Sequence, residues 1–247
     1  MELTKEELEQ FETNGYLILR NFIDSSRCDA ILDIAKAHLK HKISPIESEA
    51  EYNSQKLGLE EVTVRRLRQV YHRDIVFKEW MEDKKMRPIL KQILGDNPLI
   101  TIAHHNSIMT KMPHSSTQTS WHQDIRYWSF TNDNLISIWL ALDDEYEDNG
   151  VLEFIPASHK MSYDPDQFDK KDYFISDYAP NQPLINTKES SSLKKGDVVL
   201  FHCKLLHRAN KNSTNRAKIS FVYTVRSASN LPLINSRSSS YPEIVLN

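Results

Sequence analysis

The chain has 247 residues, of which 26% are charged and 39% hydrophobic, a composition typical of a globular protein. Its 31 Lys and Arg residues nearly balance its 34 Asp and Glu residues, so we expect neither a nucleic-acid partner nor a membrane-binding surface. Two cysteines without a CxxC motif, a charged N-terminus and the lack of a long apolar run favour a cytoplasmic location. The five glycines form no GxGxxG, GxxxxGKS/T or GxSxG motif, which disfavours dinucleotide-binding, P-loop and serine-hydrolase functions.

Helical signals dominate the first part of the chain. Thr4 begins a capping box that predicts a helix ending at Gly15, and residues 16–23 have the pattern of a buried strand. Apolar residues at helical spacing predict a helix over residues 26–39 and a helical pattern over 74–94 that is interrupted near Pro88.

Short β-type segments follow residue 98 and are separated by turn signals such as Lys195-Gly196-Asp197. Helices followed by many short strands predict a mainly β fold, an antiparallel sandwich or barrel faced by N-terminal helices. The predicted strands cover residues 99–111, 121–128, 135–144, 151–156, 197–207 and 218–226.

We expect one domain over residues 1–247, with a helical part at about 1–97, a β core at about 98–226 and a peripheral tail at 227–247. Residues 161–192 form a long polar stretch between two predicted strands. A loop of this length inside a compact domain is usually a functional lid or a disordered insertion.

One short segment, TSWHQDIRYWSF at residues 119–130, points to a metal site. His122 and Asp124 are two residues apart, and in a strand this spacing directs both side chains to one face. A third candidate ligand is His207, which ends a continuous apolar face of the strand predicted at 197–207, whereas His202 has the opposite parity.

Two imidazoles and one carboxylate on one face are the facial triad of non-haem Fe(II) oxygenases. Short His/Asp pairs also occur by chance, and a buried His–Asp hydrogen bond is the structural alternative at this point.

Longer motifs add a family resemblance. WHQDIRYW, Trp139, NGVLEFIPASHK and KKGDVVLFHCKLLHRANKNSTNRAKIS, together with the opening FETNGYLILRNFID, resemble the phytanoyl-CoA dioxygenase family from about residue 5 to 226. The resemblance implies a double-stranded β-helix, a cupin-like jelly roll, that depends on Fe(II), 2-oxoglutarate and O₂. By position, His122, Asp124 and His207 match the iron ligands.

The resemblance also implies residues that bind the co-substrate. Arg216 matches the arginine that pairs with the distal carboxylate of 2-oxoglutarate, although it lies nine residues after His207 instead of the usual eleven, which requires a shortened turn. Trp139, Ser107 and Arg66 match further co-substrate contacts. Weaker alternatives are Arg208 and Lys218 for Arg216, and Arg65 and Arg68 for Arg66; Ala209 stands where many members have a serine that helps hold the carboxylate.

The implied function is hydroxylation of an aliphatic carbon of a small-molecule substrate, with release of succinate and CO₂. Two other functions stay open: a non-catalytic jelly-roll protein that binds a metal or ligand, and a cupin-type metal hydrolase or isomerase. Neither alternative requires Arg216 or Trp139.

Arg126 and Trp128 are candidate substrate contacts. If the strand continues past Asp124, alternation places both side chains on the face of the metal ligands, so that an anionic substrate group is expected at Arg126. The alternative is that Trp128 is a wall of the core and Arg126 pairs with a carboxylate of residues 161–192.

Overall fold

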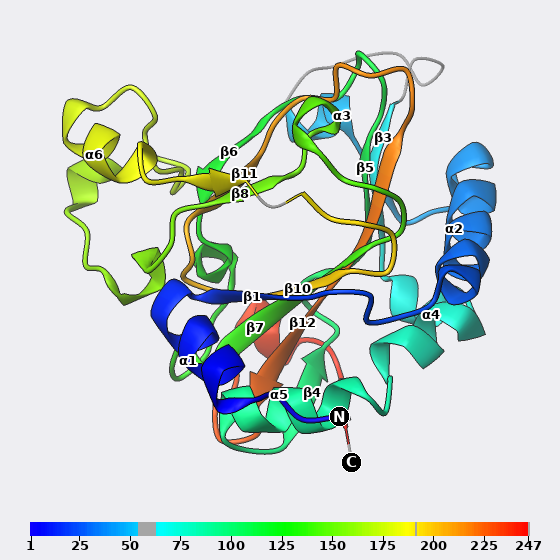
Figure 1. Ribbon diagram of the computed structural model, residues 1–247, viewed down its shortest axis with the longest axis horizontal. Coiled ribbons are helices and arrows are strands. Elements are labelled where there is room, and N and C mark those ends of the chain that lie inside the picture. The colour runs from blue at the N-terminus through cyan, green and yellow to red at the C-terminus, as the bar shows by residue number, and fades with distance from the viewer. Residues whose placement is uncertain (54–62, 191, 247) are drawn as a thin grey trace.

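Two antiparallel sheets face each other in the computed structural model, which describes residues 1–53, 63–190 and 192–246 (Figure 1). The larger sheet has the order β1 (Tyr16–Leu19), β10 (Val198–His202), β7 (Leu135–Ala141), β12 (Lys218–Ser227), β5 (Asn106–Lys111), β3 (Val64–Arg68) and β2 (Ile46–Ser48). β4 (Pro98–Thr101) also pairs with β12, and β13 (Glu243–Val245) pairs with β4. The smaller sheet has the order β6 (Thr119–His122), β11 (His207–Ala209), β8 (Leu152–Phe154) and β9 (Glu189–Ser190). This is the mainly β sandwich predicted from the sequence.

Helices from the first part of the chain cover the outer face of the larger sheet (Figure 1). The predicted capping box at Thr4 is present, and Gly15 closes the first helix in the left-handed conformation that glycine favours. The helical pattern predicted over 74–94 is interrupted, but between Met81 and Met86, and Pro88 lies inside the second helix. The helices are α1 (Lys5–Asn14), α2 (Ser25–Lys40), α3 (Glu49–Tyr52), α4 (Ile75–Met81), α5 (Met86–Leu94) and α6 (Gln182–Ile185).

Strand β12 connects the helical layer to the space between the sheets. Phe221 and Tyr223 point outward and pack edge-on against Phe77 and Trp80 of α4. Val222, between them in sequence, belongs to the apolar cluster between the two sheets. The alternation of β12 therefore fixes which of its side chains can reach an internal cavity.

Two predicted strands are interrupted. β6 ends at His122, and residues Asp124–Tyr127 form a 3₁₀ turn, so the predicted strand over 121–128 is wrong beyond His122. The strand predicted at 197–207 divides into β10 and β11, because the amide of Leu205 turns back to the carbonyl of His202. His207 therefore begins a strand of the smaller sheet instead of ending a strand of the larger one.

Residues 161–190 fold as short helical turns over a small apolar cluster of their own. Phe168 and Phe174 pack together at 5.3 Å between ring centroids, and Phe174 is buried against Trp121 in the same cluster. Residue 191, within the predicted lid, lies outside the described residues. The C-terminal segment is less peripheral than expected, since β13 pairs with β4.

No helix within residues 1–53, 63–190 and 192–246 combines the length and apolar character needed to cross a bilayer.

Phe221→Ala tests the packing of the helical layer on the larger sheet. Phe221 is completely buried, so its loss is expected to lower the free energy of unfolding by about 3–5 kcal/mol, measured by urea denaturation. Ile234→Ala is the matched control, because Ile234 is 88% exposed and its truncation is expected to change stability by less than about 0.5 kcal/mol. Equal stability of the two variants would contradict this role of Phe221.

Candidate metal centre

His122 and His207 are direct cross-strand partners on β6 and β11, and their ring centroids lie 4.2 Å apart. Asp124 follows in the 3₁₀ turn, and its Oδ1 lies 3.7 Å from His122 Nε2 and 3.6 Å from His207 Nε2. One ligand atom from each residue lies within 4.8 Å of the others, a separation compatible with a single metal ion. The structure thus gathers the three residues that the sequence singled out.

Both imidazoles are oriented by the main chain. Nδ1 of His122 hydrogen-bonds the carbonyl of Ser120 at 2.8 Å, and Nδ1 of His207 hydrogen-bonds the carbonyl of Leu205 at 3.0 Å. Each Nδ1 therefore carries the proton, and each Nε2 offers its lone pair toward Asp124. Burial lowers the pKa of both imidazoles, which favours the neutral form that binds a metal.

Asp124 is held in place through both of its carboxylate oxygens. Ser137 on β7 donates its hydroxyl to Oδ2 at 2.7 Å, and His105 Nε2 hydrogen-bonds Oδ1 at 2.9 Å. Burial acts to raise the pKa of Asp124, but His105, His207 and His122 outweigh it and hold the pKa below its ordinary value. His105 was missed from the sequence, where it lies inside the strand predicted at 99–111; in the structure it immediately precedes β5.

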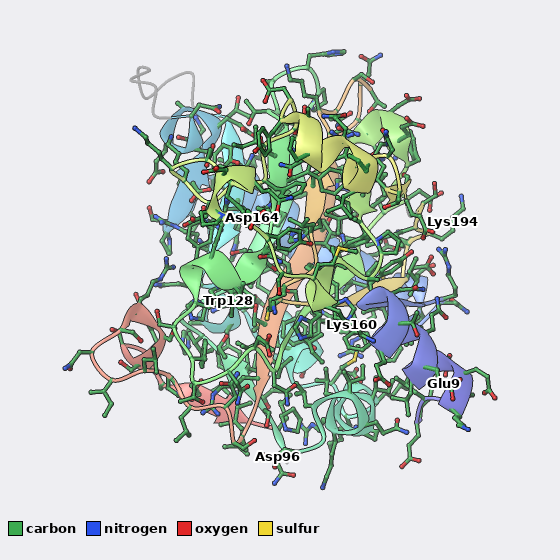
Figure 2. The ribbon with its side chains drawn as sticks, turned by 90° about the vertical axis from the view of Figure 1, so that its left-hand side faces the viewer. Glu9, Asp96, Trp128, Lys160, Asp164 and Lys194 are labelled. Atoms are coloured by element: carbon green, nitrogen blue, oxygen red, sulfur yellow. The ribbon has the colours of Figure 1, made fainter. Side chains whose placement is uncertain are left out.

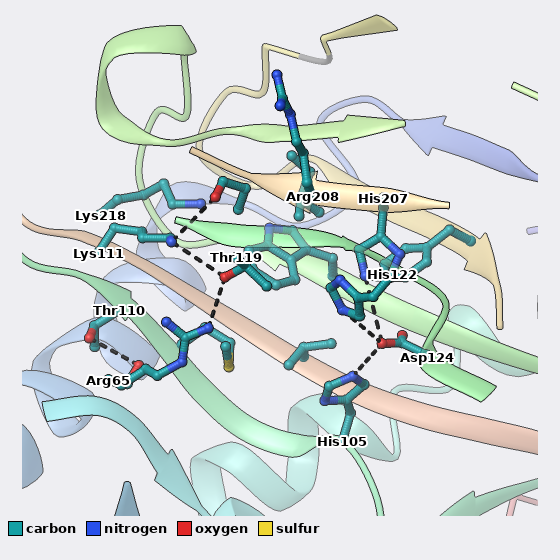
Figure 3. A pocket seen from close by; sticks show the side chains of 16 residues that line it. Arg65, His105, Thr110, Lys111, Thr119, His122, Asp124, His207, Arg208 and Lys218 are labelled. Atoms are coloured by element: carbon teal, nitrogen blue, oxygen red, sulfur yellow. Dashed lines mark hydrogen bonds and ion pairs between the residues drawn. The ribbon is translucent and has the colours of Figure 1, made fainter. Parts of the chain in front are cut away.

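An inner cavity extends from the three residues into the space between the sheets (Figure 3). Trp139 lines it, and its Nε1 donates to Glu145 Oε1 at 3.0 Å. The lining is rich in cations for a space so far from solvent: Arg65, Lys111, Arg208 and Lys218.

Lys111 is the unusual cation of this cavity. Its Nζ donates to the carbonyl of Thr117 and lies 3.5 Å from both Thr119 Oγ1 and the Ala209 carbonyl. Among the described residues, none of the carboxylates lies within 4.0 Å of it. Burial lowers the pKa of Lys111 to about 7, and the nearby Arg65 and Lys218 act in the same direction.

The expectation for Arg216 is wrong. Its side chain is 85% exposed, lies 3.7 Å from Asp143 and does not line the cavity. The reason is that β12 begins only at Lys218, which leaves Arg216 in the preceding loop. Lys218 lies eleven residues after His207, the spacing that the family resemblance implies, and its buried Nζ is 3.1 Å from Glu145 Oε2.

Two other expected co-substrate contacts line an outer cleft instead of the inner cavity. Arg66 pairs with Glu47 at 2.6 Å, and Ser107 faces the same cleft. Of the alternatives, Arg65 reaches the inner cavity, where its guanidinium donates to Thr119 Oγ1 at 2.8 Å. Met109, two residues after Ser107 on β5, also lines the inner cavity.

Ala209 lacks the hydroxyl of the serine found at this position in many family members, but a neighbouring threonine can supply one. Thr119 on β6 is the cross-strand partner of Ala209 and lines the inner cavity. Its hydroxyl lies close to both Lys111 and Arg65 (Figure 3), so it can share an anion with them.

The outer cleft, with a volume of about 500 Å³, also reaches His122 and Asp124, and it shares Arg65, His105, Met109 and Thr119 with the lining of the inner cavity. Arg126 and Trp128 both line it, although they sit in and after a turn and not on a strand. Arg126 does bind residues 161–192, but through the main-chain carbonyls of Lys171 and Asp172 and not through a carboxylate. Figure 2 views the molecule from the side on which Trp128 lies.

The family model described as Phytanoyl-CoA dioxygenase (PhyH) matches residues 11–220. The chain belongs to this family. Human peroxisomal phytanoyl-CoA dioxygenase is 25% identical over 234 residues, a match that covers 86% of this chain but only 65% of that relative's length. Ectoine dioxygenase of Halomonas elongata is 22% identical over 245 residues, covering 91% of this chain and 70% of that protein.

Solved structures of similar proteins agree with the fold. EctD from S. alaskensis, in a structure with 2-oxoglutarate and 5-hydroxyectoine, superposes with a TM-score of 0.78 at 18% identity, covering 97% of this chain and 82% of EctD. The two facing sheets of this phytanoyl-CoA dioxygenase family member therefore form the jelly roll expected from the sequence.

His207→Ala tests the metal centre directly. Loss of one of three ligands is expected to abolish binding of Fe(II) under anaerobic conditions, measured by calorimetric titration of the protein with the metal. His202→Ala is the matched control, because His202 lies close in sequence but does not line the cavity. Binding by the His207→Ala variant as tight as that of the control would remove His207 from the ligand set.

Proposed function

We propose that the protein is an Fe(II)- and 2-oxoglutarate-dependent oxygenase that hydroxylates an aliphatic carbon of a small molecule. The observation that carries the proposal is the His122–Asp124–His207 cluster, which lies between a cationic inner cavity and a larger outer cleft. Three ligands on one side of a metal leave positions open for a bidentate co-substrate and for O₂. The two spaces supply separate places for co-substrate and substrate.

Iron and 2-oxoglutarate together would supply the oxidising chemistry, with succinate and CO₂ as products of the co-substrate. The protein's own residues bind, orient and exclude water. His122 and His207 present neutral Nε2 atoms, and Asp124 presents a carboxylate held ionised by its histidine neighbours. This donor set fits Fe(II).

We propose that Lys111, Lys218 and Thr119 bind the distal carboxylate of 2-oxoglutarate. Lys218 is already paired with Glu145, whereas Lys111 has only uncharged oxygen atoms near its Nζ. An uncompensated ammonium in a buried cavity is unfavourable until an anion enters. Lys111 is therefore expected to contribute most of the charge that selects a carboxylate, and Trp139, whose ring centroid lies 5.0 Å from Lys218 Nζ, forms part of the cavity wall.

The two other candidate functions have less support. A protein that only binds a metal, or a cupin-type hydrolase or isomerase, does not need an anion site buried beyond the metal ligands. Lys111 and Lys218 form such a site, which matches the demands of a dicarboxylate co-substrate.

Turnover of 2-oxoglutarate separates these functions. The protein with Fe(II), 2-oxoglutarate and air is expected to form succinate slowly even without its substrate, measured by chromatography of the products. Omission of O₂ and the His207→Ala variant are the controls, and both are expected to form none. A protein that binds Fe(II) but forms no succinate under any of these conditions would favour one of the alternatives.

Lys111 makes the affinity for 2-oxoglutarate dependent on pH. Because its pKa in the free cavity is about 7 and the anion binds the protonated form, the apparent Kd is expected to rise by up to tenfold per pH unit above pH 7. The measurement is an anaerobic titration that follows the Fe(II)–2-oxoglutarate absorbance band between pH 6.5 and 9.

Two substitutions isolate this effect. Lys111→Met is expected to weaken binding at least tenfold at pH 6.5, because the charge-assisted pair is lost. Lys111→Arg keeps a charge that does not titrate, so binding is retained and the pH dependence is reduced. If Arg216→Ala weakened binding and Lys111→Met did not, the assignment of the distal carboxylate site would be wrong.

A further inference from the structure

The outer cleft carries more positive charge than its own residues balance. Five arginines line it, against two acidic residues, Glu47 and the metal-site Asp124. Glu47 pairs with Arg66 at 2.6 Å and lies 3.7 Å from Arg65. The arginines of the cleft are Arg65, Arg66, Arg68, Arg126 and Arg237.

Two of these arginines are charged and partly buried, yet have no carboxylate partner among the described residues. Arg126 donates to the carbonyls of Lys171 and Asp172 and lies against Tyr173, none of which is a carboxylate. Arg68 has no side-chain hydrogen bond or ion pair within that part of the chain. A guanidinium that is withdrawn from water without a counter-ion is unfavourable, so each of these positions favours an anion.

Unused hydrogen-bond donors mark the same positions. The Nε atoms of Arg66, Arg68 and Arg126 are buried and have no partner. An unpartnered buried donor is unfavourable, and native proteins contain few of them. Three in one cleft indicate donors kept for a ligand.

The arginines approach the cleft from two sides of the metal ligands. Arg66 and Arg68 are two residues apart on β3, where they pair with Met109 and Ser107 of β5, both of which line the cleft. Arg126 comes from the other side, two residues after Asp124, and its guanidinium stacks on the ring of Tyr173 at 3.8 Å. A group placed among them would lie on the open side of the metal centre.

The remaining wall of the cleft is aromatic. Trp128 packs against His104 at 5.3 Å between ring centroids, and both line the cleft with Tyr127 and Tyr241. This wall suits an organic skeleton, while the arginines suit an anionic end of the same molecule.

Resting on the proposed function, we propose that the substrate carries a dianionic phosphate-type group, a phosphate monoester or a phosphonate, bound by Arg66, Arg68 and Arg126. Such a group carries a charge of about −1.5 to −2 and three strong acceptor oxygens, enough for forked donors from two directions. A single carboxylate has one negative charge and two oxygens, and it would leave one of the two unpaired arginines without a counter-ion.

Phenylphosphonate and benzoate are a matched pair of probes, since they share a ring and differ in the anionic group. The full-length protein with Fe(II) and 2-oxoglutarate is titrated with each under anaerobic conditions by calorimetry. Phenylphosphonate is expected to bind at least tenfold more tightly than benzoate, and excess 2-oxoglutarate is expected not to displace it. Phenyl phosphate in a third titration shows whether the ester or the phosphonate fits better.

Variants place the binding at the arginines. Arg68→Gln and Arg126→Gln are each expected to lower the affinity for phenylphosphonate at least tenfold. Arg68→Lys is expected to lower it less, because a positive charge remains. Arg216→Gln is the matched control, since it removes the same charge at an exposed loop outside the cleft, and it is expected to bind like the wild type. Thermal unfolding of each variant shows that the fold is retained.

The absorbance band of bound Fe(II) and 2-oxoglutarate, recorded in the same wild-type sample, separates the two proposals. If the band is absent, the proposed function fails. If the band forms but benzoate binds as tightly as phenylphosphonate, or the Arg68→Gln and Arg126→Gln variants bind like Arg216→Gln, the dianionic substrate is ruled out.

Discussion

The pairing of β11 with β6 is the constraint on which the site depends. In this register His207 lies directly opposite His122, so two imidazoles from strands 85 residues apart in sequence meet on one face. A slip by one residue would turn either side chain to the opposite face. The same pairing brings Thr119 opposite Ala209, which adds a hydroxyl to the inner cavity. One strand pair therefore sets both the ligand cluster and part of the anion site beyond it.

The larger sheet forms the wall opposite β6 and β11, and it supplies side chains that bind Asp124 or line the inner cavity. Ser137 and Trp139, two residues apart on β7, both point between the sheets: the first donates to Asp124, and the second lines the inner cavity. Lys218 reaches the same space from β12, the strand whose other face packs on the helices. Packing against the apolar helical layer thus holds β12 in place, and β12 in turn positions the ammonium group of Lys218 in the cavity.

Sequence patterns predicted the fold class and the three candidate ligands, but not all of the geometry. His122, Asp124 and His207 meet as expected, although Asp124 lies in a turn and His207 begins a separate strand. Arg216 failed because its choice assumed a shortened turn before β12; the turn is not shortened, and Lys218, at the eleven-residue spacing that the resemblance implies, begins the strand. Lys111 was missed because its burial results from contacts between distant strands, and an isolated lysine in a sequence gives no sign of them.

The two spaces beside the metal ligands share Arg65 but differ in the cations that have no carboxylate partner among the described residues: Lys111 in the inner cavity, and Arg68 and Arg126 in the outer cleft. Lysine is a compact charge whose pKa falls on burial, as it does for Lys111, so the inner cavity can be nearly neutral until an anion enters. Arginine stays charged at all accessible pH values and offers a planar fork, so Arg68 and Arg126 keep the outer cleft positive whether or not it is filled. The cleft therefore attracts an anion at any pH, whereas the inner cavity binds its anion more strongly as the pH falls towards 7 and Lys111 becomes protonated; below that pH the affinity levels off. A small dicarboxylate and a larger anionic substrate can in this way be sorted into two places that share one metal centre.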